Sequence, residues 1–154
     1  MEAGDTLPAL TLEDDTGRAT ELTTFVGRPL VLFFYPKADT PGCTNEAKDF
    51  TAHAADFEAL GVRVVGASPD KAGKQGKFRA KHELSMTLLA DEETALAQAC
   101  GVWVEKSMYG KTYMGVERST FLFDAEGRCI EAWRKVKVKG HVEAVLKAAR
   151  KQFG

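Results

Sequence analysis

The sequence predicts an α/β fold with a mixed central sheet, helices on both faces of that sheet and an N-terminal β-hairpin. Strand-like apolar runs alternate with helical patterns through the first two thirds of the chain, which requires parallel strands joined by right-handed crossovers. Two further runs flank a tight turn near the C-terminal end and form an antiparallel pair. The 154 residues suffice for one domain and are too few for two ordinary ones, so residues 1–154 are expected to form a single domain.

The N-terminal part is predicted to contain a hairpin, a buried strand and a helix. Ala9–Leu12 and Ala19–Leu22 flank the turn-rich segment Asp14–Gly17. Leu30–Tyr35 is an uninterrupted apolar run between two prolines, as expected for a strand that is covered on both faces. Apolar residues then recur every three or four positions and predict one amphipathic helix that ends at Gly61. They are Ala47, Phe50, Ala54, Phe57 and Leu60.

The middle of the chain continues the alternation of strand and helix. Val62–Ala67 and Thr87–Leu89 have the composition of strands. A polar helix is expected from about Ser68 to His82, and a short helix is expected over Thr94–Cys100.

The C-terminal part has a different pattern. Val104–Val116 is predicted to be a structured loop near the functional site. Arg118–Phe123 and Arg128–Trp133 surround a glycine-containing turn and predict a hairpin. Lysine and valine alternate over Lys135–Lys139, which would place three lysines on one side of a strand. A final amphipathic helix is indicated by Val142, Val145, Leu146, Ala149 and Phe153.

Composition and charge exclude several classes of function. The chain has 21 basic and 22 acidic side chains and a formal charge of −1, so it lacks a field that would gather nucleic acid or anionic lipid. No apolar stretch is long enough to cross a bilayer, and Met1–Asp5 lacks the basic and apolar regions of a signal peptide. We therefore expect a cytoplasmic protein with no nucleic-acid or membrane partner.

The three cysteines and three histidines do not form a disulfide framework or a metal site. Three cysteines are an odd number and lie far apart in the sequence. Cys100 at a helix end and Cys129 on a hairpin strand are expected to be buried. His53, His82 and His141 are scattered, so surface or helix-cap positions are expected for them. We expect neither a metal nor a cofactor.

Cys43 differs from the other two cysteines because of its position at a helix start. Thr40 and Pro41 have the residue types of an N-cap and a first helical position. Cys43 should then lie in the first helical turn, where free backbone N–H groups and the helix dipole favour a thiolate. A lone cysteine is otherwise most often a small buried apolar residue.

Several motifs of the chain resemble one known family. The segment Thr40–Thr44, read Thr-Pro-Gly-Cys-Thr, is similar to the signature of the peroxiredoxins, specifically the bacterioferritin comigratory protein or peroxiredoxin Q branch. Phe33–Pro36, Met108–Lys111, Gly115–Phe121 and Trp133–Val136 also resemble that branch and occur in the same order. The resemblance covers nearly the whole chain.

This resemblance implies a thioredoxin-like fold and the reduction of hydrogen peroxide or organic hydroperoxides at Cys43. The Cys43 thiolate would attack the peroxide and become a sulfenic acid. Arg118 would supply a cation, Thr40 a hydroxyl that orients the peroxide, and Pro36 a cover that limits water. Glu46 resembles the carboxylate that orients the arginine. The alternative interpretations are structural. Arg118 would be a surface arginine, Thr40 would only mark the start of a helix, and Pro36 would only end a strand.

The resemblance also raises the question of how the sulfenic acid is reduced. Many members of this branch carry a second, resolving cysteine five residues after the first, where this chain has Lys48. Others carry it in the segment that corresponds to Gly76–Lys81, which contains no cysteine. We therefore expect a one-cysteine enzyme that uses an external thiol such as thioredoxin, glutaredoxin or glutathione.

Three alternatives remain open at this point. Cys100 is a weak candidate for a resolving cysteine in a two-cysteine peroxidase. A peroxide sensor or redox-switched partner protein could use oxidation of Cys43 as its signal. A disulfide reductase is disfavoured because Cys43 is followed by Asn45 and Glu46, without the second cysteine of a Cys-x-x-Cys motif. Related proteins of the branch are often monomers, so we expect a monomer.

Overall fold

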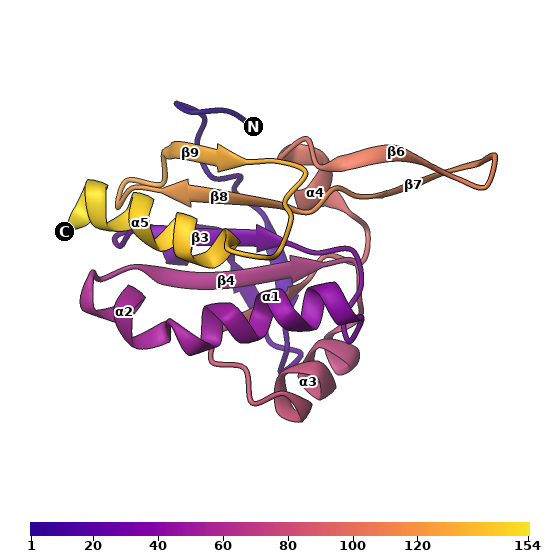
Figure 1. Ribbon diagram of the computed structural model, residues 1–154, viewed down its shortest axis with the longest axis horizontal. Helices are drawn as coiled ribbons and strands as arrows, with labels where there is room; N and C mark the ends of the chain where they lie inside the picture. The colour runs from indigo at the N-terminus through magenta and orange to yellow at the C-terminus, as the bar shows by residue number, and fades with distance from the viewer.

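The central feature of the computed structural model, which describes residues 1–154, is one seven-stranded mixed sheet (Figure 1). Its strands are β1 (Thr11–Asp14), β2 (Ala19–Glu21), β3 (Leu30–Phe34), β4 (Arg63–Ser68), β5 (Thr87–Ala90), β8 (Ser119–Phe123) and β9 (Cys129–Trp133). Their order across the sheet is β2-β1-β5-β4-β3-β8-β9. The pairs β3–β4 and β4–β5 are parallel, whereas the other pairs are antiparallel. The predicted mixed sheet and N-terminal hairpin are confirmed.

Helices cover both faces of this sheet, as predicted. The helices are α1 (Pro41–Ala52), α2 (Ala54–Ala59), α3 (Ala72–Lys81), α4 (Ala95–Ala99) and α5 (His141–Phe153), with a short 3₁₀ helix η1 (Leu22–Phe25). In Figure 1, α1, α2 and α5 lie in front of the sheet and α4 lies behind it. No helix of the chain is both long and apolar enough to cross a membrane.

Strand β3 separates two hydrophobic cores. All five of its residues are buried, and its side chains alternate between the two faces. Val31 and Phe33 pack under α1, α2 and α5, whereas Leu32 and Phe34 pack on the α4 side. This burial on both faces explains why the strand is apolar at every position.

The predicted helix that ends at Gly61 is broken into two. α1 ends at Ala52 and α2 begins at Ala54. His53 lies between them, and its ψ of 12° leaves the helical region. His53 caps both helices, and its N–H donates to the carbonyl oxygen of Asp49. Phe50 and Phe57 still reach the same core across the break, which is why their spacing looked like one continuous helix.

The prediction of a loop over Val104–Val116 is wrong, because this segment forms a second β-hairpin. Strands β6 (Trp103–Met108) and β7 (Lys111–Val116) pair with each other in a separate two-stranded sheet, which extends away from the body of the protein (Figure 1). The turn residues Tyr109 and Gly110 both have positive φ, of 53° and 77°. Two consecutive positive φ values define the tight turns that suit β-hairpins, and tyrosine rarely adopts this conformation.

Two further predictions in the C-terminal part are wrong. Lys135–Lys139 forms bends and a turn rather than a strand, because β9 ends at Trp133 and Lys135 takes a positive φ of 48°. His141 is the first residue of α5 and is buried rather than exposed. Its ring packs edge-on against Phe50 and Trp133, which removes it from the surface. His53 and His82 occupy helix caps, as predicted.

Candidate active site

Cys43 lies in the first turn of α1, as predicted. Thr40 is the N-cap residue with extended backbone angles, and Pro41 occupies the first helical position. The carbonyl oxygen of Thr40 accepts the first helical hydrogen bond, from the N–H of Thr44, at 2.8 Å. Cys43 therefore stands among backbone N–H groups that have no partner within the helix. Its own side chain is completely buried.

The register of the sheet brings Arg118 to Cys43. Phe34, the last residue of β3, pairs with Ser119, the first residue of β8. Arg118, one residue earlier, must therefore lie next to the C-terminal end of β3. The chain leaves β3 and enters α1 at this end of the strand (Figure 1). Its Nη2 donates a hydrogen bond to Sγ of Cys43 at 3.3 Å. The two residues are 75 positions apart in the sequence, so only the fold creates this contact.

Gly42 leaves room for this contact. A Cβ atom at position 42 would lie 3.1 Å from Nη2 of Arg118, which is closer than most Cβ contacts in proteins. Glycine at this position therefore allows the Arg118 guanidinium to come close. It is not needed there for a positive φ angle. Sequence reasoning missed this role, although the glycine directly precedes the cysteine.

Glu46 lies one helical turn after Cys43 and binds the other side of the guanidinium. Oε1 of Glu46 accepts a hydrogen bond from Nη1 of Arg118 at 2.9 Å. Glu46 has no exposed surface, and its Oε2 is the only buried side-chain N or O atom of the chain without a hydrogen-bond partner. Burial raises the pKa of Glu46 to about 7, although the neighbouring Arg118 charge opposes this shift. Glu46 thus contacts Arg118, the arginine that the resemblance implies it orients.

Thr40 and Pro36 lie on the segment that leads from β3 into α1, and neither makes a hydrogen bond to Cys43. The Thr40 hydroxyl donates to the carbonyl oxygen of Lys37 at 2.7 Å instead of capping the helix. Thr40 and Pro36 are both half-buried. In this arrangement the Thr40 oxygen keeps its lone pairs free to accept a hydrogen bond from a bound molecule.

Polar contacts connect the loop before α1 with α3 and the residues that flank it. Sequence reasoning missed these contacts. The N–H of Ala38 donates to Oδ2 of Asp70 at 2.7 Å. Asp39, which has a positive φ of 63°, accepts hydrogen bonds from Lys81 at 2.9 Å and contacts His82 at 2.8 Å. These contacts join residues more than 30 positions apart, so no local pattern in the sequence indicates them.

Cys100 and Cys129 are buried, as predicted, and both lie in the other core. Cys43 belongs to the core under α1 and α5, whereas Cys100 and Cys129 belong to the core on the α4 side of the sheet. All three cysteines are free thiols. Burial raises the pKa of Cys100 to about 12 and also raises that of Cys129, which disfavours a thiolate at either position.

Most of the exposed aromatic and methionine side chains belong to the β6–β7 hairpin. Tyr109 lies at the hairpin tip and is 97% exposed, so its ring does not cover Cys43. Met114 is about half exposed, whereas Trp103 packs against the core on the α4 side.

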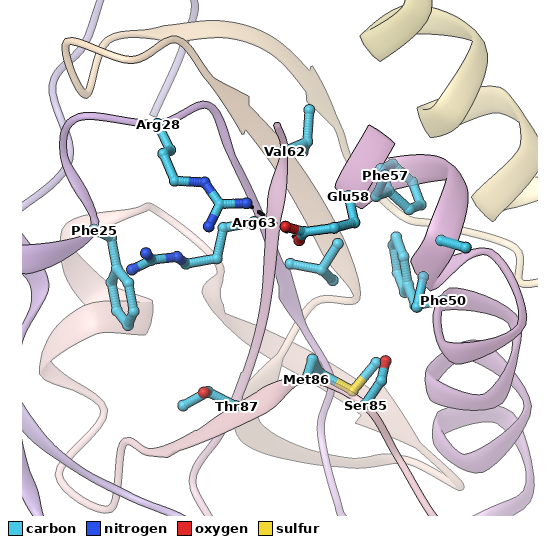
Figure 2. A pocket seen from close by; sticks show the side chains of 13 residues that line it. Phe25, Arg28, Phe50, Phe57, Glu58, Val62, Arg63, Ser85, Met86 and Thr87 are labelled. Carbon is cyan, nitrogen blue, oxygen red and sulfur yellow. Dashed lines mark hydrogen bonds and ion pairs between the residues drawn. The ribbon is translucent and has the colours of Figure 1, made fainter. Parts of the chain in front are cut away.

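A surface hollow of about 490 Å³ lies at the other end of the parallel strands, where β4 begins (Figure 2). In this hollow Arg28 and Glu58 form an ion pair at 3.2 Å, and the Arg63 guanidinium lies 5.3 Å from the centre of the Phe25 ring. Cys43 is not among its lining residues. This hollow is therefore separate from the buried cluster of Cys43, Glu46 and Arg118.

Comparisons with known proteins give a consistent result. Residues 3–132 match the model of the AhpC/TSA family. Peroxiredoxin Bcp of Bacillus subtilis is 49% identical over 150 residues, which cover 97% of this chain and 96% of that protein. Peroxiredoxin Bcp of Xanthomonas campestris is 45% identical over 148 residues, which cover 94% of this chain and 92% of that protein.

Solved structures agree with these relatives. The bacterioferritin comigratory protein of Xanthomonas campestris, solved in a study of its alkyl peroxide reduction activity, superposes with a TM-score of 0.93 at 42% identity, covering 99% of this chain and all of that one. A Mycobacterium tuberculosis protein, BcpB, superposes with a TM-score of 0.87 at 34% identity over 98% of this chain and 97% of that one. The thioredoxin-like fold implied by the resemblance is thereby confirmed. The chain belongs to the AhpC/TSA family and, within it, to the Bcp or peroxiredoxin Q peroxiredoxins, which are thiol-dependent peroxidases.

Proposed function

We propose that the chain reduces hydrogen peroxide and organic hydroperoxides at Cys43. The observation that carries this proposal is the hydrogen bond between Nη2 of Arg118 and Sγ of Cys43 at 3.3 Å. A guanidinium cannot lose its charge in a protein, so it favours the anionic, nucleophilic form of the sulfur. The alkyl peroxide reduction studied in the Xanthomonas relative supports organic hydroperoxides as substrates.

The reaction requires only groups that surround Cys43. The sulfur anion attacks the terminal peroxide oxygen, an S–O bond forms, the O–O bond breaks, and the electron pair leaves with the second oxygen. Arg118 donates hydrogen bonds to the developing negative charge, which moves from the sulfur to the leaving oxygen. The Thr40 oxygen accepts a hydrogen bond from the peroxide and orients it, while Pro36 limits the access of water.

The geometry favours a one-cysteine mechanism in which an external thiol reduces the sulfenic acid. The sheet lies between Cys43 and the other two cysteines, because they belong to the cores on its opposite faces. A disulfide requires the two Cα atoms to come within about 7 Å, so bridging these faces would require local unfolding. Lys48, at the usual position of a resolving cysteine, is exposed on α1. Thioredoxin, glutaredoxin or glutathione would then act as the reductant.

Peptide mass mapping tests both parts of this proposal. Reduced protein treated with one equivalent of peroxide should carry a trapped sulfenic acid at Cys43 and no internal disulfide. A Cys43–Cys100 or Cys43–Cys129 disulfide would overturn the one-cysteine mechanism. Peroxide consumption is then titrated with thioredoxin and, separately, with glutaredoxin and glutathione, to identify the thiol that sustains turnover. Rapid oxidation of Cys43 that no thiol reverses would instead indicate a peroxide sensor.

We further propose that the protein is a cytoplasmic monomer. Three free thiols suit a reducing compartment. The exposed large apolar side chains are Val26, Met108, Tyr109, Tyr113 and Met114, and all but Val26 belong to the narrow β6–β7 hairpin. No broad apolar face of the size that stable dimers bury is therefore present.

A further inference from the structure

The buried cluster at the site contains one cation and two acids. Arg118 contacts Sγ of Cys43 through Nη2 and Oε1 of Glu46 through Nη1. Cys43 and Glu46 have no exposed surface, and the Arg118 side chain is only 17% exposed. If Cys43 and Glu46 were both ionised, the cluster would carry a net negative charge away from water. Such a charge is strongly disfavoured away from water, so one of the two acids should hold a proton.

The hydrogen bonding of Glu46 indicates which acid holds the proton. Donors at both oxygens stabilise a buried ionised carboxylate, but Oε2 of Glu46 has no hydrogen-bond partner and Oε1 has only Arg118. An unsatisfied buried oxygen costs more when the group is charged than when it is neutral. Burial also raises the pKa of Glu46 to about 7, although the Arg118 charge opposes this shift.

Other titratable groups near the cluster do not replace Glu46 as the group that holds the proton. Asp49, one turn along α1, is a further carboxylate whose charge raises the pKa of Glu46. His141 faces Arg118 from α5, but burial and the Arg118 charge lower its pKa to about 4, so it is neutral near physiological pH. Lys106 approaches Arg118 and Cys43 from β6, and burial and the Arg118 charge lower its pKa. Neither base makes a hydrogen bond to Glu46.

We propose that Glu46 stores one proton in the reduced site, holding it while Cys43 is a thiolate and releasing it when Cys43 becomes a sulfenic acid. This inference rests on the proposed role of Cys43 as the reacting sulfur. It assigns Glu46 a function in the reaction beyond orienting Arg118. Glu46 acts through Arg118 and is a positioning and proton-holding residue rather than a group that touches the peroxide.

The proposal balances atoms and charge. The reduced cluster holds a thiolate, a guanidinium and a neutral carboxylic acid. The sulfur loses two electrons and gains an S–OH group, the O–O bond breaks, and the leaving oxygen takes up one proton to become water or an alcohol, while Glu46 releases one proton to solvent. The oxidised cluster then holds a neutral sulfenic acid, a guanidinium and a carboxylate. The net charge of the buried cluster is the same before and after, so no uncompensated charge forms during the reaction.

The first test measures the proton balance of one oxidation in weakly buffered solution at mildly alkaline pH, using a pH indicator. The wild-type protein should show no net uptake of protons from solvent for each Cys43 that is oxidised, because Glu46 releases one proton as the leaving oxygen gains one. The Glu46→Gln variant keeps an oxygen for Arg118 but carries no proton of its own, so it should take up one. Asp49→Asn is the matched control and should behave as the wild type. Uptake of one proton by the wild type would overturn the proposal.

The second test identifies the protonated group directly in the wild-type protein and does not depend on a variant that folds. The infrared difference spectrum between reduced and oxidised protein should show the C=O stretch of a carboxylic acid only in the reduced state. The band should be missing in Glu46→Gln, and its absence from the wild type would overturn the proposal. Mass spectrometry of the same samples counts oxidised Cys43. If Cys43 is not oxidised at all, it is the proposed function that fails.

Discussion

Cys43 and Cys100 are equally buried on opposite faces of one sheet, yet their surroundings favour opposite chemistry. At Cys43 a guanidinium nitrogen lies 3.3 Å from the sulfur. At Cys100 a guanidinium is also near, but Nη2 of Arg134 donates to the backbone oxygen of Cys100 at 3.4 Å rather than to the sulfur. Burial then raises the pKa of the Cys100 thiol to about 12. We therefore expect the reactivity of these two thiols to depend on what the neighbouring cation contacts and not on exposure.

Removing each sulfur in turn tests the difference between Cys43 and the two cysteines on the other face. Cys43→Ser should reduce peroxide consumption to the uncatalysed rate, because a hydroxyl cannot replace a thiolate as the nucleophile. Cys100→Ser and Cys129→Ser are matched controls and should keep the wild-type rate. Peroxide consumption with excess thiol measures all three. Loss of activity in either control would show that the α4 side of the sheet takes part in the reaction.

The second prediction concerns the two guanidinium groups. Arg118→Ala should slow oxidation of Cys43 by about 100- to 1000-fold, because it removes a preorganised donor to the charge that develops in the transition state. Arg134→Ala, which removes the guanidinium near Cys100, should change this rate by less than about twofold, since it acts on the other face. Stopped-flow measurement of the second-order rate constant distinguishes the two. Equal effects of the two changes would contradict the account.

The comparison also shows what the sequence could and could not predict. The helix start at Thr40 and Pro41 is a local pattern, so the place of Cys43 in the first turn was predictable. The contact between Arg118 and Cys43 depends on the register of β3 and β8, and only the family resemblance indicated it in advance. The assignment of Cys100 and Cys129 to the opposite core depends on the order of all the strands.

The missed elements have equally specific causes. Tyr109 takes a positive φ in the turn between β6 and β7, a conformation that the sequence signals of hairpins assign to glycine, asparagine or aspartate. The Ala38–Asp70 bond joins a loop to a segment 32 residues away, and no periodic pattern records such a bond. His141 is buried by packing on Phe50 and Trp133, which a single histidine at a helix start does not reveal.

The third prediction concerns a substitution on the Cys43 face that removes no charged group. Gly42→Ala places a Cβ atom 3.1 Å from Nη2 of Arg118 and should displace the guanidinium. We expect the oxidation rate constant to fall about 10-fold, since small displacements of catalytic groups are costly. Gly73→Ala is the matched control, because position 73 has open space around its Cβ and also lies in a helix. An unchanged rate in Gly42→Ala would mean that the guanidinium can shift without loss.

The fourth prediction concerns stability on the Cys43 face. His141 is buried and its Nε2 lies 2.8 Å from the Thr120 hydroxyl, and burial lowers its pKa from 6.5 to about 4. The unfolded chain therefore binds a proton more readily than the folded protein between these values, so stability is lost as the pH falls through this range. The loss should be roughly 3 kcal/mol. Urea unfolding of the wild type and of His141→Gln across this pH range tests it, and an identical acid slope in both would contradict it.

The central claim is that peroxide chemistry is confined to the Cys43 face of the sheet. Its most direct test is the second-order rate constant for peroxide with a variant in which Cys100 and Cys129 are both serine. The account predicts the wild-type rate constant, far above that of a free thiol, and full turnover with an external thiol. A rate no faster than that of a free thiol, or loss of turnover in this variant, would contradict it.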